Sequence, residues 1–240
     1  MASAKDIIVK VIPSSVANPF VKAHHYSGKV VQNSTLHLGA FLNGRLHGVM
    51  SFGSPTDKRK VIGLVISKKT GEPAPWYDML ELNRMAFDDV LPANSESRCI
   101  AVAIRLLKKN APNIKWILSF ADGTQCGDGT IYRASGFQLT NIKRNKSLLV
   151  LPDGTKIHEL TISSGMNTPR PELNGKSLAD ISGGSASTRA YCEYTGAKPL
   201  EGFQLRYIKI IDPDYMLAAP PLPYSAIQEA GAGMYKGEKR

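Results

Sequence analysis

The sequence is poor in cysteine and contains no long apolar run. Its three cysteines, Cys99, Cys126 and Cys192, are widely spaced and form no Cys-x-x-Cys pair. This spacing argues against a disulfide framework and a zinc ribbon, and it favours a reducing compartment such as the cytoplasm. No stretch reaches the roughly 18 apolar residues that cross a membrane. Lys5 and Asp6 interrupt the start, so we expect neither a membrane span nor a signal peptide.

Acidic residues are also scarce relative to basic ones. The chain has 30 Lys and Arg against 20 Asp and Glu, which leaves a formal net charge of +10. Such a charge favours binding to the phosphates of nucleic acid, and the alternative is a cationic surface that serves only solubility. The basic residues that we expect to contact nucleic acid form two clusters: Lys58, Arg59, Lys60, Lys143, Arg144 and Lys146.

Hydrophobic periodicity predicts a strand, a helix and a hairpin in the first part of the chain. Residues 6–12 form an apolar run typical of a strand. The next segment begins with two serines that can cap a helix, and Gly28 can end it. Two apolar runs then meet at Asn43-Gly44, a pair favoured in tight hairpin turns.

The middle of the chain continues the alternation. The pattern predicts a strand over 77–89, a helix within 91–114 with capping and stop residues at its ends, a buried strand over 114–122 and a short helix over 127–137. A further strand and a hairpin that turns at Asp153-Gly154 follow. Strands that alternate with helices in this way indicate an α/β fold with a mixed central sheet flanked by helices.

The composition changes after this second hairpin. Residues 163–201 are rich in Ser, Gly, Thr and Asn and lack periodicity, which predicts an irregular excursion inserted before a last strand over 202–212. Residues 213–240 are rich in Pro and Gly and predict an extended C-terminal tail. We therefore expect a single domain over 1–212, with the excursion as a candidate contact for nucleic acid.

Six stretches of the chain carry a family resemblance: HHYSGK, HGVMSFG, LELNRMAFDD, LPANSESR, FADGTQCGDGTIYRASGF and GAKPLEGFQLRYI. Together they resemble the phage Mom-type DNA adenine-modification proteins, a divergent GNAT-like family, over residues 20–212. The order of strands and helices also resembles that of GNAT acyl-CoA N-acyltransferases. The resemblance implies conversion of the 6-amino group of adenine in DNA to a carbamoylmethyl (acetamido-type) adduct. Such a product shields phage DNA from host restriction, in the cytoplasm of the bacterial host.

The resemblance implies a donor site at the start of the helix within 91–114. Ser95 and Ser97 lie where free backbone amides and the helix dipole favour an anion, and Arg98 adds a positive charge. The glycine loop typical of GNAT proteins is missing here, so acetyl-CoA and an aminoacyl-tRNA both stay open as donors. The alternative is a plain helix capped by serine.

Arg84 lies near the polar end of the strand over 77–89. An inward-facing Arg needs an acidic partner or an anionic ligand. One explanation is an exposed ion pair with Asp88 or Glu81. The family resemblance favours the other explanation, in which Arg84 helps to bind the donor.

Asp122 and Tyr132 are the first two candidate catalytic residues. Asp122 ends the buried run at the point where open α/β sheets place ligands, and its carboxylate can orient or deprotonate an amine. Tyr132 lies in the next short helix, and a tyrosine in this neighbourhood protonates the leaving group in GNAT enzymes. The alternatives are an Asp that caps a turn and an aromatic ring that only packs.

His25 and Tyr26 are the other two candidate catalytic residues, because this His-Tyr pair matches the family. We expect His25, Tyr26, Asp122 and Tyr132 to converge from three segments on one site. The family has been linked to iron, and the resemblance makes His25 and Asp122 the candidate ligands.

Two rival functions have distinct consequences. An ordinary GNAT-type N-acetyltransferase that acts on a small-molecule or protein amine needs CoA and no DNA. A non-catalytic nucleic-acid-binding module binds DNA in a salt-sensitive way and modifies nothing. In the main hypothesis the partner is double-stranded DNA with a flipped adenine, joined by tRNA if the donor is an aminoacyl group. The sequence leaves the oligomeric state open, a dimer included.

Overall fold

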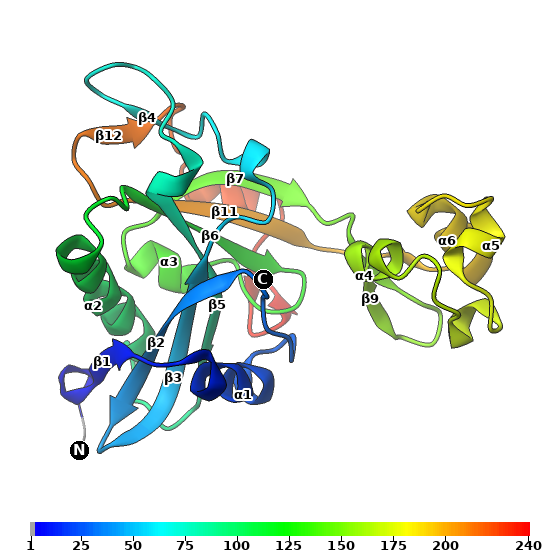
Figure 1. Ribbon diagram of the computed structural model, residues 1–240, viewed down its shortest axis with the longest axis horizontal. Helices are drawn as coiled ribbons and strands as arrows, with labels where there is room; N and C mark the ends of the chain where they lie inside the picture. Colours follow the sequence, from blue (N-terminus) through cyan, green and yellow to red (C-terminus); the bar gives the residue numbers. More distant parts are fainter. Residues whose placement is uncertain (1–2) are drawn as a thin grey trace. The chain divides into compact units, whose positions relative to one another are not determined.

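The computed structural model describes residues 3–240, and its centre is a seven-stranded mixed sheet (Figure 1). In spatial order the strands are β1 (Ile8–Val11), β2 (Ser34–Leu42), β3 (Arg45–Gly53), β5 (Met79–Phe87), β6 (Trp116–Gly123), β11 (Phe203–Ile210) and β7 (Gln138–Arg144). The first four pair antiparallel, whereas β5 and β6 pair parallel. The prediction of an α/β fold with a mixed central sheet is therefore confirmed.

The β2–β3 hairpin turns at the predicted pair. Asn43 and Gly44 both adopt left-handed φ angles, 50° and 77°. Two consecutive positive φ angles define the turn whose twist matches a two-residue hairpin, and Asn-Gly tolerates them at low cost.

Helices α1 (Ser14–His24) and α2 (Ser95–Asn110) are the long helices beside this sheet (Figure 1). The buried residues of α2, Cys99, Ile100, Ala103 and Leu107, recur at helical spacing. Its last turn carries two lysines that complement the helix dipole. Helix α1 ends at His24, four residues before the predicted Gly28, so the His25-Tyr26 pair lies beyond the helix.

A smaller two-stranded sheet packs beside the start of β5. It joins β4 (Val65–Ser67) to β12 (Tyr215–Leu217), and the 3-10 helices η2 (Lys58–Lys60) and η3 (Trp76–Asp78) flank it in the chain. Its apolar residues form one cluster with buried residues of the central sheet: Val61, Val65, Ala74, Met79, Trp116, Leu118, Ile208 and Leu217.

The residues Lys143–Gln204 form a compact unit of their own. They contain strands β8 (Leu148–Val150), β9 (Lys156–His158) and β10 (Lys198–Pro199), and helices α4 (Glu159–Ser164), η4 (Pro171–Leu173), α5 (Leu178–Ser182) and α6 (Thr188–Thr195). The segment 163–201 therefore contains several short helices, where its composition predicts an irregular excursion. The Ser and Gly residues cap the ends of these helices. Ser177 and Ser187 cap the N-termini of α5 and α6, and left-handed Gly183 and Gly196 end the two helices.

The C-terminal residues pack against the first unit. Residues 213–240 contain, besides β12, helix α7 (Ser225–Glu229) and strands β13 (Met234–Tyr235) and β14 (Glu238–Lys239). Ile227 is fully buried, and the Asp128 amide donates to the Met234 carbonyl at 3.0 Å. The predicted extended tail is thus an ordered segment bonded to the loop between β6 and α3 (Thr130–Ala134). None of the helices within residues 3–240 has the length and apolar character needed to cross a membrane.

Candidate active site

The parallel strands β5 and β6 separate along their length. Their pairing covers Met79–Leu82 and Trp116–Ser119, and both strands then continue beyond the last pair, to Phe87 and Gly123. Their carboxyl ends therefore leave a gap in the sheet. In open α/β sheets, such a place outside the carboxyl ends of parallel strands is where ligands bind.

A β-bulge in β5 decides which side chains face this gap. The register pairs three alternate residues of β3 with three residues of β5: Val49 with Ala86, Ser51 with Arg84, and Gly53 with Glu81. Directly paired residues lie on the same face, and alternate residues of one strand share a face. The bulge at Asn83 therefore brings Glu81 and Arg84, three positions apart, onto one face, where a regular strand would separate them.

Helix α1 covers the same face. Its buried Ala17 and Val21 pack against Val49 and Ala86. The chain leaves α1 at His25 and runs past the end of β5, where the Arg84 Nε donates to the Lys29 carbonyl at 2.8 Å. His25, Tyr26 and Arg84 thus lie together, although they come from separate elements. Arg84 donates to main-chain carbonyls and forms no ion pair with Asp88, which instead bonds His47 Nδ1 at 2.8 Å.

Asp122 lies on β6 at the gap and accepts several hydrogen bonds. The Thr124 amide donates to its Oδ1 at 2.9 Å, and the Thr124 hydroxyl donates to the same oxygen. Gln125 Nε2 reaches Oδ2 at 3.5 Å, and the Tyr26 hydroxyl bonds the same carboxylate. Asp122 therefore caps the turn that follows β6 and holds Tyr26 at the same time.

Burial and neighbouring charges shift the pKa values of His25 and Tyr26. Burial, with a smaller contribution from the Arg84 charge, lowers the pKa of His25 to about 4, so its imidazole is neutral at pH 7. Burial and the neighbouring Asp122 raise the pKa of Tyr26, which keeps its phenol protonated. Tyr26 is therefore a hydrogen-bond donor, and 50% of the residue is exposed.

The described residues do not fit an iron site. The His25 Nδ1 accepts from the Ser27 amide at 3.2 Å and contacts the Ser27 hydroxyl at 2.8 Å, so this nitrogen is occupied. Within residues 3–240 there is no group of three or more His, Cys, Asp or Glu side chains placed to hold a metal ion. The predicted pair of His25 and Asp122 thus gains no third His, Cys, Asp or Glu ligand among the described residues.

Tyr132 approaches the gap from the other face of the sheet. Ser119 pairs with Leu82, and these two alternate with the residues that face α1. Tyr132, from α3, hydrogen-bonds the Ser119 side chain. Its ring packs on Phe137 and Tyr207 with centroids 5.5 and 5.4 Å away, and burial raises its pKa to about 12. Both faces of the sheet therefore contribute side chains to the gap.

Two residues of this site were missed in the sequence analysis. Glu81 appeared there only as a partner for Arg84, and burial raises its pKa to about 7 against the opposing effect of the Arg84 charge. Phe120 shares the face of Asp122 because it lies two positions earlier on β6, and 37% of it is exposed. Period-two alternation signals Phe120, but no simple pattern in the sequence reveals the bulge that re-aims Glu81.

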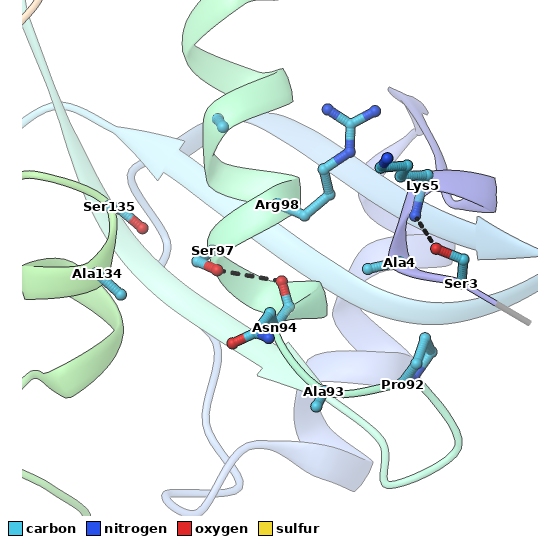
Figure 2. A pocket seen from close by; sticks show the side chains of 11 residues that line it. Ser3, Ala4, Lys5, Pro92, Ala93, Asn94, Ser97, Arg98, Ala134 and Ser135 are labelled. Carbon is cyan, nitrogen blue, oxygen red and sulfur yellow. Dashed lines mark hydrogen bonds between the residues drawn. The ribbon is translucent and has the colours of Figure 1, made fainter.

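A pocket of about 810 Å³ opens at the start of α2 (Figure 2). Lys5, Asn94, Ser97 and Arg98 line it, and no side chain caps the first turn of the helix. The Arg98 Nε atom is buried there without a hydrogen-bond partner. An uncapped 16-residue helix with two cations beside it suits an anionic group.

Ser95 differs from the expectation for this donor site. It is only 1% exposed, and its hydroxyl donates to the Pro92 carbonyl at 2.5 Å. Its side chain therefore fixes the turn before α2. The Ser97 hydroxyl donates to the Asn94 carbonyl at 3.1 Å but lies at the pocket surface (Figure 2).

The basic residues expected to contact nucleic acid fall in both compact units. Lys58, Arg59 and Lys60 form η2 and are exposed; Lys58 Nζ lies 3.6 Å from the centroid of the Trp76 ring, and Arg59 pairs with Asp57. The three others, Lys143, Arg144 and Lys146, belong to the unit 143–204.

Comparison of this chain with known proteins identifies the family to which it belongs. The model of the Mom protein family matches residues 6–226. A curated relative, the methylcarbamoylase Mom of Escherichia phage Mu, is 34% identical over 165 residues, which cover 67% of this chain and 64% of the relative. Solved structures that overlap this chain include a Bacillus subtilis acetyltransferase in complex with CoA (9% identity, TM-score 0.44, 85% of this chain and 98% of that chain). Another is the Escherichia coli ribosomal-protein-S18-alanine N-acetyltransferase (10% identity, TM-score 0.45, 86% and 94%). The family match spans nearly the whole chain, including the strands β5 and β6 and helices α1, α2 and α3 that form the site, and the protein belongs to the Mom protein family.

Proposed function

We propose that this protein is an enzyme that converts the 6-amino group of adenine in DNA to a carbamoylmethyl (acetamido-type) adduct. Membership of the Mom family supports this function, and so does the name of its methylcarbamoylase relative. The observation that carries the proposal is the convergence of His25, Tyr26, Arg84, Asp122 and Tyr132 at the gap between β5 and β6.

The acceptor is an adenine that has left the DNA stack. Its amine is paired and out of reach inside a duplex, so a base must flip into the site. Tyr26 and Phe120 offer exposed aromatic surface on the face of Asp122, and stacking on such rings binds an unpaired base. The neighbouring Asp122 carboxylate and the polar His25 edge can then orient the 6-amino group.

The donor occupies the other side of the gap. The pocket at the start of α2 supplies positive charge from Lys5 and Arg98 and the free end of the helix dipole, which suits the phosphates of CoA or of tRNA. Tyr132 reaches the gap from this face with its phenol protonated. It donates a proton to the leaving group as the donor bond breaks.

DNA docks on the basic surface. The exposed η2 residues Lys58, Arg59 and Lys60 carry three positive charges on one short turn, which suits contact with phosphates. The unit 143–204 is a candidate for additional contacts through Lys143, Arg144 and Lys146. Because the product shields DNA from host restriction, the reaction belongs in the cytoplasm of the bacterial host.

The test is mass analysis of nucleosides from bacteria that express the protein. We expect a modified deoxyadenosine with wild type and its loss with Asp122→Ala, while plasmid DNA from the wild-type culture resists restriction enzymes. Expression of soluble protein with unmodified deoxyadenosine contradicts the proposal. Tight CoA binding together with acetylation of a free amine then indicates an N-acetyltransferase. Salt-sensitive DNA binding alone indicates a binding module.

A further inference from the structure

Glu81 lies in the last paired stretch of β5 before the gap, and its carboxylate has no hydrogen-bond or ion-pair partner among the described residues. It lies on the same face of β5 as Arg84 and pairs directly with Leu118 of β6. The nearby Arg84 acts on it through its charge but donates its hydrogen bonds to the carbonyls of Lys29 and Asn83.

Asp122 differs from Glu81 in this respect. Its two oxygens accept from the Thr124 amide and hydroxyl, from Gln125 and from Tyr26. A carboxylate held by several donors has its lone pairs engaged in orienting the groups around it. Asp122 thus positions Tyr26 and the turn after β6, whereas the Glu81 carboxylate has no such donors.

We propose, on the basis of the function proposed above, that Glu81 is the general base that accepts the proton lost by the adenine 6-amino group. The geometry that carries this assignment is the bulge at Asn83, which turns Glu81 to the face of Arg84, Phe120 and Asp122. An unpartnered carboxylate beside the aromatic surface for the base is free to accept that proton.

The chemical step balances without a further reactant. The adenine nitrogen forms a bond to the carbon of a donor that carries the carbamoylmethyl group. The bond between that carbon and the leaving group breaks, and the leaving group departs with the electron pair. One proton of the amine passes to Glu81, and the Tyr132 phenol protonates the leaving group.

The charged and titratable groups around Glu81 have pKa values that lie far from that of Glu81. Arg84 on β5 and Tyr132 on α3 are the groups that interact with it, and His25 and Tyr26 after α1 face Arg84. The pKa of His25 is lowered to about 4, and that of Tyr132 is raised to about 12. Glu81, with a pKa raised to about 7 by burial, is therefore the group of this set that ionises near neutral pH.

The experiment measures adenine modification as a function of pH. Purified full-length protein is incubated with duplex DNA and an undialysed extract of non-expressing bacteria, which supplies both CoA derivatives and aminoacyl-tRNA. Nucleosides are quantified by mass spectrometry between pH 5.5 and 9. We expect the wild-type rate to rise about tenfold per pH unit below about pH 7 and to level off above it.

The variants separate a catalytic role from a structural one. Glu81→Gln should lower the plateau rate by about 100-fold or more and abolish the pH step, whereas Glu81→Asp should keep the step with a reduced rate. The exposed Glu72→Gln is the matched control and should behave as wild type. DNA binding by each variant, measured by fluorescence anisotropy, should be unchanged.

Three outcomes overturn the inference in distinguishable ways. Unmodified adenine with wild type, in the extract and in expressing cells, refutes the proposed function and the role of Glu81 with it. A Glu81→Gln protein that modifies adenine as fast as wild type refutes only the role of Glu81. A slower Glu81→Gln protein that keeps the pH step shows that another group is the base.

Discussion

The Tyr26 hydroxyl is hydrogen-bonded to the Asp122 carboxylate, which joins the segment after α1 to the end of β6. The two residues are 96 positions apart in the chain, and each has a second attachment. Asp122 caps its own turn through Thr124, and Tyr26 follows His25, whose ring lies 4.3 Å from the Tyr26 ring. This bond therefore fixes one wall of the gap between β5 and β6.

Tyr26→Phe removes this hydrogen bond and retains the exposed ring. We expect adenine modification to fall by about 10- to 100-fold, because a hydrogen bond to a charged group contributes on the order of 1.5–3 kcal/mol. The thermal midpoint should also fall, by roughly 2–4 °C for each kcal/mol lost, because the bond joins two segments of the fold. The measurement is the rate of modification under single turnover, and a rate equal to that of wild type argues against a role for the pair.

Tyr132→Phe tests the proposed proton donor. Removal of a general acid costs about 100- to 10,000-fold in rate, and affinity for DNA should stay constant because Tyr132 is buried away from solvent. Tyr207→Phe is the matched control, since the Tyr207 hydroxyl donates to the Asp128 carbonyl at 2.5 Å and supports the same loop. Equal losses in both variants would indicate that the loop is disturbed and that no proton is donated.

Arg59→Ala tests the DNA-binding surface. Arg59 is highly exposed, and its loss should weaken binding to all duplex sequences alike. Each lost phosphate contact reduces the slope of log affinity against log salt by about 1. Arg45→Ala removes the same charge from the tip of the β2–β3 hairpin and serves as the control. Identical slopes for both variants would place the DNA elsewhere.

Local patterns in the sequence were sufficient for much of this fold. The hairpin at Asn43-Gly44, the spacing of apolar residues in α2 and the buried run of β6 each reflect one physical rule that acts over a few residues. Composition was a poor guide to the unit 143–204, because its Ser and Gly residues cap short helices around a core that contains fully buried Tyr191. Such a core arises from contacts distant in the chain.

The site was predictable only in part, because one of its residues is placed by strand pairing between segments distant in the chain. His25, Tyr26, Asp122 and Tyr132 were found through family resemblance, and the structure brings them together with Arg84. Glu81 was missed as a catalytic candidate because strict alternation puts it opposite Arg84. The bulge that reverses this depends on pairing with β3, which involves residues about 30 positions away.

The raised pKa of Glu81 also predicts how the stability of the folded protein depends on pH. Burial raises its folded-state pKa from 4.5 to about 7, so the folded protein holds this proton more tightly than the unfolded chain does. Stability is then lost as pH rises from the unfolded pKa through the folded one, and the loss is complete above about pH 7. Gln is neutral at every pH and avoids this loss.

We therefore expect Glu81→Gln to be more stable than wild type at pH 8 and to lose that advantage towards pH 4. A difference of about 2 kcal/mol is expected at pH 8, after a discount for the partial exposure of the side chain. Urea unfolding of both proteins at pH 4.5, 6 and 8 measures it, with Glu72→Gln as the control. A variant that is more stable but no longer modifies adenine would show that the Glu81 carboxylate is retained for chemistry. Equal stabilities at all three pH values would mean that Glu81 ionises as freely in the folded protein as in the unfolded chain.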